Sequence, residues 1–435
     1  MENPFIRSFR AFIKRNPEHK IGFILIILSI IAGVIYLPME NSIEDCGGTY
    51  KEPEIAMDSE YRGLWVVRTS MKSKESIEEV IDRASMNNFN FLLVQVNGRG
   101  EAYYESDIIP KVPGVPEDFD PLAFCIERAH AVGIDVHAWI NAFTVGELGR
   151  KKYQENHVLT QHPEWCLVDS DSVSTFDYTH KMAKNEIVSI MLDPAIEGVK
   201  EYVRKVFMDV ITKYDVDGVH FDYIRYPGKT YGYSKVARQM FKDLTGYDPI
   251  DIVKAPETFR NKAVDGKDLL GNINNEWDEF RRDQVTETVR RVYSDIKKIK
   301  PHIAVSCAVL PDINDSYNRK MQDWQKWIEE DIVDFIVPMV YTPDTHEFTT
   351  YMESAVEPFS GERVLAGVGV YRMLDNPMGC IEKIETAREL GTSGIVLFSY
   401  DSIKDKADYW EALVSGPFES PAVTPVMAPS VLNKN

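Results

Sequence analysis

The chain has 435 residues, 11% of them aromatic, and a formal net charge of −19. This length exceeds that of one small domain and suits a parallel barrel with inserted loops. The acidic balance and the lack of a basic stripe in the sequence argue against nucleic acid as a partner.

The N-terminus differs from the rest of the chain. Residues 1–20 carry a net charge of +3, and the remainder carries −22. An apolar run from Ile21 to Leu37 follows, and no charged side chain interrupts it before Glu40. Its length is near the lower limit of the roughly 17–25 residues that span a bilayer.

We therefore expect a basic cytoplasmic segment at 1–20 and a transmembrane signal-anchor helix at 21–39. Because positive flanks stay in the cytoplasm, the rest would lie on the extracytoplasmic side of the inner membrane as a single-pass protein. A signal peptide that is cleaved to release the protein is the alternative. The long apolar run, with no small-residue cleavage pattern after it, favours the anchor.

Residues 40–60 are expected to form a linker, and residues 415–435, rich in Pro, Ser and Val, a disordered tail. Between them, strand-like runs alternate with helical patterns, which is typical of βα units and a parallel sheet. Helix starts are indicated by Ser76 with Glu79 as a capping box and by Asp120 before Pro121. Eight strands are predicted, at 63–68, 91–96, 134–140, 216–222, 303–309, 334–341, 364–370 and 394–400.

Eight βα units predict an α/β fold, a (β/α)8 TIM barrel over 61–414, with long insertions at 142–190 and about 228–275. A doubly wound open sheet is the competing fold. It would be expected to show a glycine-rich phosphate turn after an early strand, and the run 97–100 (Asn-Gly-Arg-Gly) is only a fragment of one.

In such a barrel the C-terminal ends of the strands meet at one mouth. The most informative stretch is 217–227, where alternation places His220 and Asp222 on one face of a strand. The other strand ends contribute further polar and aromatic side chains. The candidate substrate-binding residues are Gln95, Asn97, Arg99, His137, Trp139, Asn141, Asp193, His220, Tyr223, Arg225, Tyr341, Tyr371 and Tyr400.

Several of these have a structural alternative. His137, His220, Trp139 and Tyr341 also suit packing inside the barrel, and Asp193, which precedes Pro194, also suits a helix N-cap. The histidines show no HxH or HExxH spacing, and the five cysteines form no CxxC pair. No cofactor or metal site is therefore predicted.

Two carboxylates are candidate catalytic residues. Glycoside hydrolysis commonly uses one protonated and one ionised carboxyl group. Asp222 stands between His220 and Arg225 in the sequence, which favours the ionised role, whereas Glu101 is bracketed by aromatic residues, which favours the acid role. The alternatives are a loop-fixing hydrogen-bond role for Asp222 and a surface position for Glu101.

Several motifs of this chain match motifs of a known family, in the same order along the sequence. They are 62–66 (RGLWV), 95–97 (QVN), 137–141 (HAWIN), 162–165 (HPEW), 192–194 (LDP) and 217–223 (DGVHFDY). On these motifs, from roughly Tyr61 to Tyr400, the chain resembles the glycosyl-hydrolase-like 10 family of bacterial exported proteins.

The resemblance implies a (β/α)8 barrel and hydrolysis of a glycosidic bond in polysaccharide, since a member of the family cuts peptidoglycan glycan strands. It places Asp222 at the family's acidic strand-four position and Glu101 at its acidic strand-two loop. The chain departs from many relatives at Tyr223, where they carry a second acid. It also has Ile224 where family 18 chitinases carry their catalytic Glu.

The leading hypothesis is a membrane-anchored glycosidase that acts on cell-wall or envelope polysaccharide. A glycan-binding barrel without catalysis and a metal-dependent barrel deacetylase are the alternatives. The sugar linkage, retention or inversion, and the oligomeric state stay open.

Overall fold

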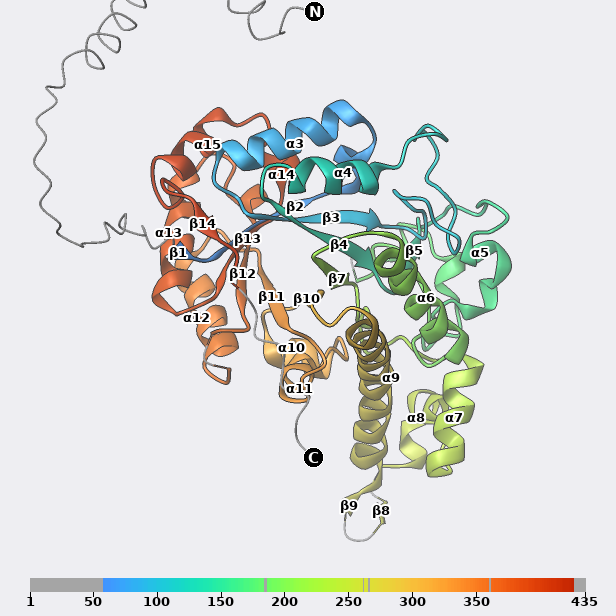
Figure 1. Ribbon diagram of the computed structural model, residues 1–435. Helices are drawn as coiled ribbons and strands as arrows, with labels where there is room; N and C mark the ends of the chain where they lie inside the picture. Colours follow the sequence, from blue (N-terminus) through green and yellow to red (C-terminus); the bar gives the residue numbers. More distant parts are fainter. Residues whose placement is uncertain (1–57, 184–185, 261, 265–266, 360, 426–435) are drawn as a thin grey trace, which may run out of the picture. The chain divides into compact units, whose positions relative to one another are not determined.

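The computed structural model describes residues 58–425 except 184–185, 261, 265–266 and 360. Its centre is a closed barrel of parallel strands, each hydrogen-bonded to the next in chain order (Figure 1). The barrel strands are β2 (Tyr61–Val66), β3 (Phe91–Asn97), β4 (Asp135–Asn141), β7 (Gly218–Asp222), β10 (Ala304–Val309), β11 (Phe335–Val340), β12 (Leu365–Val368) and β13 (Gly394–Leu397). The predicted TIM barrel is confirmed, and all eight strands coincide with predicted ones.

Three strand ends differ from the prediction in a way that matters for the mouth. β2 ends at Val66 because a 3-10 turn, η1 (Arg68–Met71), begins two residues later. β12 ends at Val368 before the turn η5 (Val370–Arg372), and β13 ends at Leu397 because the short helix α14 (Tyr400–Ile403) follows. The loops of the mouth therefore begin earlier than the apolar runs suggest.

Helices surround the barrel, as Figure 1 shows. Their apolar faces and the outward faces of the strands form one large buried cluster. The helices beside the barrel are α3 (Lys74–Met86), α4 (Pro121–His130), α6 (Glu197–Lys213), α9 (Leu269–Ile299), α10 (Ile313–Asn318), α11 (Trp324–Glu329), α12 (Thr345–Val356), α13 (Pro377–Glu389) and α15 (Ala407–Val414).

Two helix N-caps are predicted from the sequence, and the structure confirms one of them. Asp120 caps α4 as predicted, accepting a hydrogen bond from the amide of Ala123 at 3.0 Å, with Pro121 in the first turn. The predicted capping box at Ser76 and Glu79 is wrong by one turn. The cap of α3 is Ser73, whose hydroxyl accepts from the amide of Ser76 at 3.2 Å.

Both insertions are structured. The first carries the strand pair β5 (Thr144–Gly146) and β6 (Ile190–Met191), the short helix α5 (Val158–Gln161), and the turns η2 (Pro163–Trp165) and η3 (Thr175–Asp177). The second forms α7 (Lys235–Thr245), α8 (Pro249–Lys254), the turn η4 (Pro256–Thr258) and the hairpin β8 (Ala263–Val264) to β9 (Lys267–Asp268). α7 and α8 lie beside the projecting part of α9 (Figure 1) and share with it a small separate core around Phe241 and Trp277.

The borders of the barrel domain lie outside the predicted ones. β1 (Asp58–Ser59), in the expected linker, pairs in parallel with β14 (Ala422–Val423), in the expected tail. Phe418 is fully buried, and its ring packs against Phe89 with centroids 5.1 Å apart. Residues 415–425 are therefore part of the fold, because Phe418 packs against Phe89 and β14 pairs with β1.

The expected anchor at 21–39 lies outside the described residues. Within 58–425, with the gaps given above, no helix is long and apolar enough to cross a bilayer.

Large aromatic rings fill the inside of the barrel, and glycines on the neighbouring strands leave room for them. The inward cluster includes Tyr61, Trp65, Phe91, Trp139 and Phe335, all nearly inaccessible. Glycines face them on neighbouring strands: a Cβ on Gly63 would lie 2.4 Å from the ring of Phe91, and one on Gly218 would lie 2.3 Å from Nδ1 of His137. The pairing of large rings with glycine fills the inside of the barrel.

We therefore predict that Gly218→Ala lowers the free energy of unfolding by about 1–3 kcal/mol, because the added methyl group overpacks the ring of His137. Urea unfolding followed by circular dichroism measures this. Gly228→Ala is the matched control, since its Cβ would meet only ordinary contacts at 3.8 Å or more. Equal stability of the two variants would contradict the packing argument.

Candidate functional site

A cavity of about 220 Å³ lies where the barrel strands end. It is smaller than the roughly 300–1,000 Å³ typical of sites for drug-sized ligands, so it suits a single ring of a longer molecule. The residues that line it are Trp65, Val67, Gln95, Trp139, Asp222, Tyr223, Arg225, Ala308, Met339, Tyr341 and Phe398.

The walls of the cavity are mostly aromatic. Tyr341 and Phe398 stack with centroids 5.1 Å apart, and Trp65 meets the edge of Phe398 at 5.8 Å. Tyr371, 41% exposed, lies outside this pair and contacts both rings. Flat apolar surfaces of this kind suit the C–H faces of a sugar ring.

Asp222 is the sole carboxylate among the described residues that line the cavity. Its Oδ2 accepts a hydrogen bond from Nε1 of Trp139 at 3.1 Å, and its Oδ1 accepts from the amide of Tyr223 at 2.7 Å. Tyr223 reaches this position with a φ of +51°, a left-handed conformation that is uncommon outside glycine.

Burial raises the pKa of Asp222, and the nearby charge of Arg225 and the two hydrogen bonds lower it only in part. This direction differs from the sequence-based expectation of a lowered pKa. The expectation counted charged neighbours in the sequence, whereas desolvation is the larger effect in the folded chain.

Arg225 supplies the positive charge of the cavity. Its Nη1 lies 3.6 Å from Oδ1 of Asp222, and its guanidinium lies 4.6 Å from the centre of the Tyr223 ring. Nη1 is buried and has no hydrogen-bond partner. A buried donor without a partner costs free energy, and an acceptor on a bound ligand would satisfy it.

His220 faces the barrel interior, as Asp222 does, but it belongs to the layer below. Its Nε2 accepts from Nε1 of Trp65 at 3.3 Å, so Nδ1 carries the proton toward Oγ of Ser306 at 2.9 Å. Burial lowers the pKa of His220 to about 3 and that of His137 to about 4. Both rings are therefore neutral near pH 7. Neither lines the cavity.

Glu101 lies in the loop after β3 and is not among the residues that line the cavity. Its side chain is 11% exposed, and its Oε1 lies 3.1 Å from Nη2 of Arg150. The guanidinium of Arg150 is itself held over the ring of Tyr153, with 4.4 Å to the centroid. Glu101 is thus a buried, ion-paired carboxylate of the rim rather than a surface acid.

Amide side chains hold the loop that carries Glu101. Gln95 donates to Oδ1 of Asn141 at 3.3 Å, and Asn141 donates to the carbonyl of Gly98 at 2.9 Å. Asn97 accepts from the amide of Gly100 at 3.0 Å. These predicted site residues therefore position the loop, and Gln95 also lines the cavity. Arg99 points elsewhere and forms an ion pair with Glu147 at 2.8 Å.

Two other candidates do not line the cavity. Asp193 is fully buried, and its Oδ1 accepts from the amide of Ala195 at 3.0 Å and from the hydroxyl of Tyr226 at 3.3 Å. It forms a turn before α6 rather than an N-cap, because α6 begins only at Glu197. Tyr400 is buried in the helical layer next to Trp410.

The sequence-based list missed five residues that line the cavity: Trp65, Val67, Ala308, Met339 and Phe398. Trp65 alternates with Gly63 along β2, Val67 continues this alternation just after the strand, and Phe398 continues that of Gly394 and Val396 after β13. The same period of two that identified His220 and Asp222 could have found them. A further missed residue is Arg68, whose Nη1 donates to Oε1 of Gln95 at 2.8 Å.

Solved structures share the fold. The glycoside hydrolase domain of PgaB (BpsB) from Bordetella bronchiseptica aligns with a TM-score of 0.58 at 13% identity, covering 82% of this chain and 98% of that one. α-L-Fucosidase isoenzyme 2 from Paenibacillus thiaminolyticus aligns with a TM-score of 0.56 at 16% identity, covering 83% and 49%. At such identities the likeness concerns the barrel alone.

Curated relatives are similar in sequence. Glycosyl hydrolase YngK of Bacillus subtilis (strain 168) is 26% identical over 319 residues, which cover 65% of this chain and 54% of the relative. Glycosyl hydrolase DigH of Escherichia coli (strain K12) is 24% identical over 337 residues, covering 69% and 66%. The chain thus spans between about half and two thirds of the length of these relatives. Residues 60–378 match the model of the family described as Glycosyl hydrolase-like 10, and the chain belongs to that family.

Proposed function

We propose that this protein is a glycosidase that hydrolyses O-glycosidic bonds in cell-envelope polysaccharide, with peptidoglycan glycan strands as its substrate. Asp222 is the carboxylate at the reacting sugar, and Glu101 is the second carboxyl group, entering from the loop after β3. The aromatic walls hold the sugar ring, and Arg225 binds an oxygen of the substrate.

The observation that carries the proposal is the setting of Asp222. A carboxylate lies inside an aromatic cavity at the C-terminal end of a barrel, fixed by Trp139 and by its own backbone neighbour. Next to it, Arg225 has a buried donor without a partner. Membership in a glycosyl hydrolase-like family and the names of the curated relatives support the same chemistry.

The N-terminal apolar run supports the substrate class. If residues 21–39 anchor the chain with its barrel outside, the enzyme is held next to the envelope polymer. An aromatic cavity with room for one ring also fits a saccharide better than an extended peptide.

A glycan-binding barrel without catalysis is the second candidate. It is favoured by the lone carboxylate among the described lining residues and by the ion pair that already holds Glu101 to Arg150. The two candidates differ in one product: only a glycosidase releases reducing ends from glycan strands.

We predict that Asp222→Asn lowers turnover on peptide-free glycan strands by a factor of at least about 10², and that Glu101→Gln lowers it by about 10²–10⁴. The measurement is the release of reducing ends from purified strands, with intact cell wall and neutral polysaccharides in parallel. Wild-type activity in both variants would refute the assigned site. No release by the wild type would favour the binding barrel.

Folding of the Asp222→Asn variant provides the control. Because burial raises the pKa of Asp222, its ionised form opposes folding at neutral pH, above the pKa of the unfolded chain. The isosteric amide has one acceptor oxygen, so it can keep the hydrogen bond from Trp139 or the one from the amide of Tyr223, but not both. The lost hydrogen bond offsets the removal of the buried charge, so the thermal midpoint of the variant should stay close to that of the wild type while activity falls.

The charge of Arg225 predicts a shift of the pH profile. Arg225 lowers the pKa of Asp222 against the effect of burial, so Arg225→Gln should raise that pKa. The ionised form is then lost at higher pH, and the acid limb of kcat/KM moves to higher pH. Arg372→Gln, an exposed change in η5, should leave the limb in place. If the acid limb of kcat/KM does not move in Arg225→Gln, a group other than Asp222 controls that limb.

A further inference from the structure

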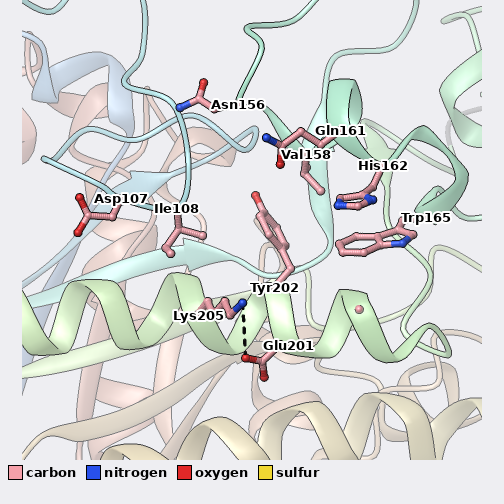
Figure 2. Close-up of a pocket in the computed structure, with 11 residues that line it drawn as sticks. Asp107, Ile108, Asn156, Val158, Gln161, His162, Trp165, Glu201, Tyr202 and Lys205 are labelled. Carbon is pink, nitrogen blue, oxygen red and sulfur yellow. Dashed lines mark ion pairs between the residues drawn. The ribbon is translucent and has the colours of Figure 1, made fainter.

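A second cavity, of about 340 Å³, lies on the flank of the barrel and shares no lining residue with the cavity of Asp222. Three separate stretches of chain form it: the loop after β3 at 107–108, the segment 156–165, and the first half of α6 (Figure 2). We call it the flank groove. It includes the ends of the HPEW motif, His162 and Trp165, which the proposed active site does not use.

The aromatic wall of the flank groove is held in place by His162 and Gly198. The ring of His162 stacks on that of Trp165 with centroids 3.8 Å apart and planes 5° apart. Gly198 of α6 also lies against the indole, where a Cβ would come within 2.4 Å of Cζ2 of Trp165. Only glycine allows this approach, so the indole is a rigid wall whose edge faces the groove.

Tyr202 of α6 rises into the middle of the groove, as Figure 2 shows. Its hydroxyl is buried and has no hydrogen-bond partner. Most buried hydroxyls are paired, so this one is expected to bind a ligand group or water. The amides of Asn156 and Gln161 lie on the side toward which the ring points (Figure 2) and offer both donors and acceptors.

The acidic side chains of the flank groove are already neutralised. Asp107 forms an ion pair with Lys213 at 2.7 Å, and Glu201 accepts two hydrogen bonds from Arg204 at 2.7 and 2.8 Å. Lys205, which also lines the groove, lies 3.9 Å from Glu201. A groove with the edge of an aromatic ring, planar amides, a hydroxyl without a partner and paired charges suits a ligand with C–H groups and hydroxyl groups. A saccharide has this chemistry.

The flank groove is connected to the loop of Glu101. His157, next to α5, donates from Nε2 to the carbonyl of Arg99 at 3.0 Å, because its Nδ1 accepts from the amide of Leu159 at 3.1 Å. The segment that lines the groove therefore also fixes the rim of the proposed active site.

We propose that the flank groove is a second glycan site, which holds another segment of the polymer that the barrel cavity cleaves. This inference rests on the proposed function for the identity of the polymer. It predicts that long strands bind at two places, whereas a short oligosaccharide needs the barrel cavity alone.

The test separates binding from hydrolysis. In the inactive Asp222→Asn chain, Tyr202→Phe should weaken the binding of peptide-free glycan strands about three- to tenfold, since it deletes one hydrogen-bonding group. Trp165→Ala should weaken it by about tenfold. Isothermal titration measures both, and Tyr351→Phe on α12, outside both cavities, should match the parent.

Kinetics of the otherwise wild-type chain provide the second readout. Tyr202→Phe should raise KM for long strands while kcat, and kcat/KM on a tetrasaccharide cut from the same strands, stay unchanged. Its thermal midpoint should not fall, because the hydroxyl has no partner to lose. Unchanged strand affinity in both Tyr202→Phe and Trp165→Ala would overturn the inference.

The outcomes distinguish this inference from the proposed function. If strands bind in a Tyr202-dependent way but the wild type releases no reducing ends, the second site stands and the glycosidase proposal fails. If the wild type cleaves strands and the groove variants bind them normally, the glycosidase proposal stands and the second glycan site is wrong. If strands do not bind at all, both are wrong.

Discussion

Removal of one carboxylate from water governs the candidate site. Asp222 ends a strand inside a ring of aromatic side chains, where its charge loses hydration that Trp139, Arg225 and one backbone amide replace only in part. The donors must therefore be held rigidly, because an unpaired buried charge is costly. Next to Asp222, hydrogen bonds join Trp65, which lines the cavity, to His220 and His220 to Ser306, so this part of the barrel is fixed without a charge.

The barrel makes this arrangement possible through its inner packing. Large rings fill the interior because glycines stand opposite them, as Gly63 does for Phe91 and Gly218 for His137. The rings continue upward into the walls of the cavity, so the same packing that closes the barrel also shapes the aromatic surface that we propose binds a sugar. Stability and recognition depend on one set of side chains in this part of the molecule.

The loops contribute the side chains that hold Glu101 and its neighbours at the mouth of the barrel. The insertion after β4 contributes Arg150, which pairs with Glu101, and His157, which fixes the carbonyl of Arg99. The same insertion supplies the aromatic wall of the flank groove. The insertion is held on the barrel by its own buried side chains, such as Val145, Val158 and Leu167, and by the pairing of β5 with β6.

The sequence by itself determined the eight strands, their order and the inward face of Asp222, because alternation and apolar runs are local properties of the chain. It also indicated that Gln95, Trp139, Tyr223, Arg225 and Tyr341 lie near the strand ends. Tertiary structure alone decided that His137 and Tyr400 lie away from the cavity, that residues 415–425 pack on the barrel, and that burial outweighs Arg225 at Asp222. Depth along a strand, desolvation and contacts between distant loops depend on the closed barrel, and no local pattern encodes them.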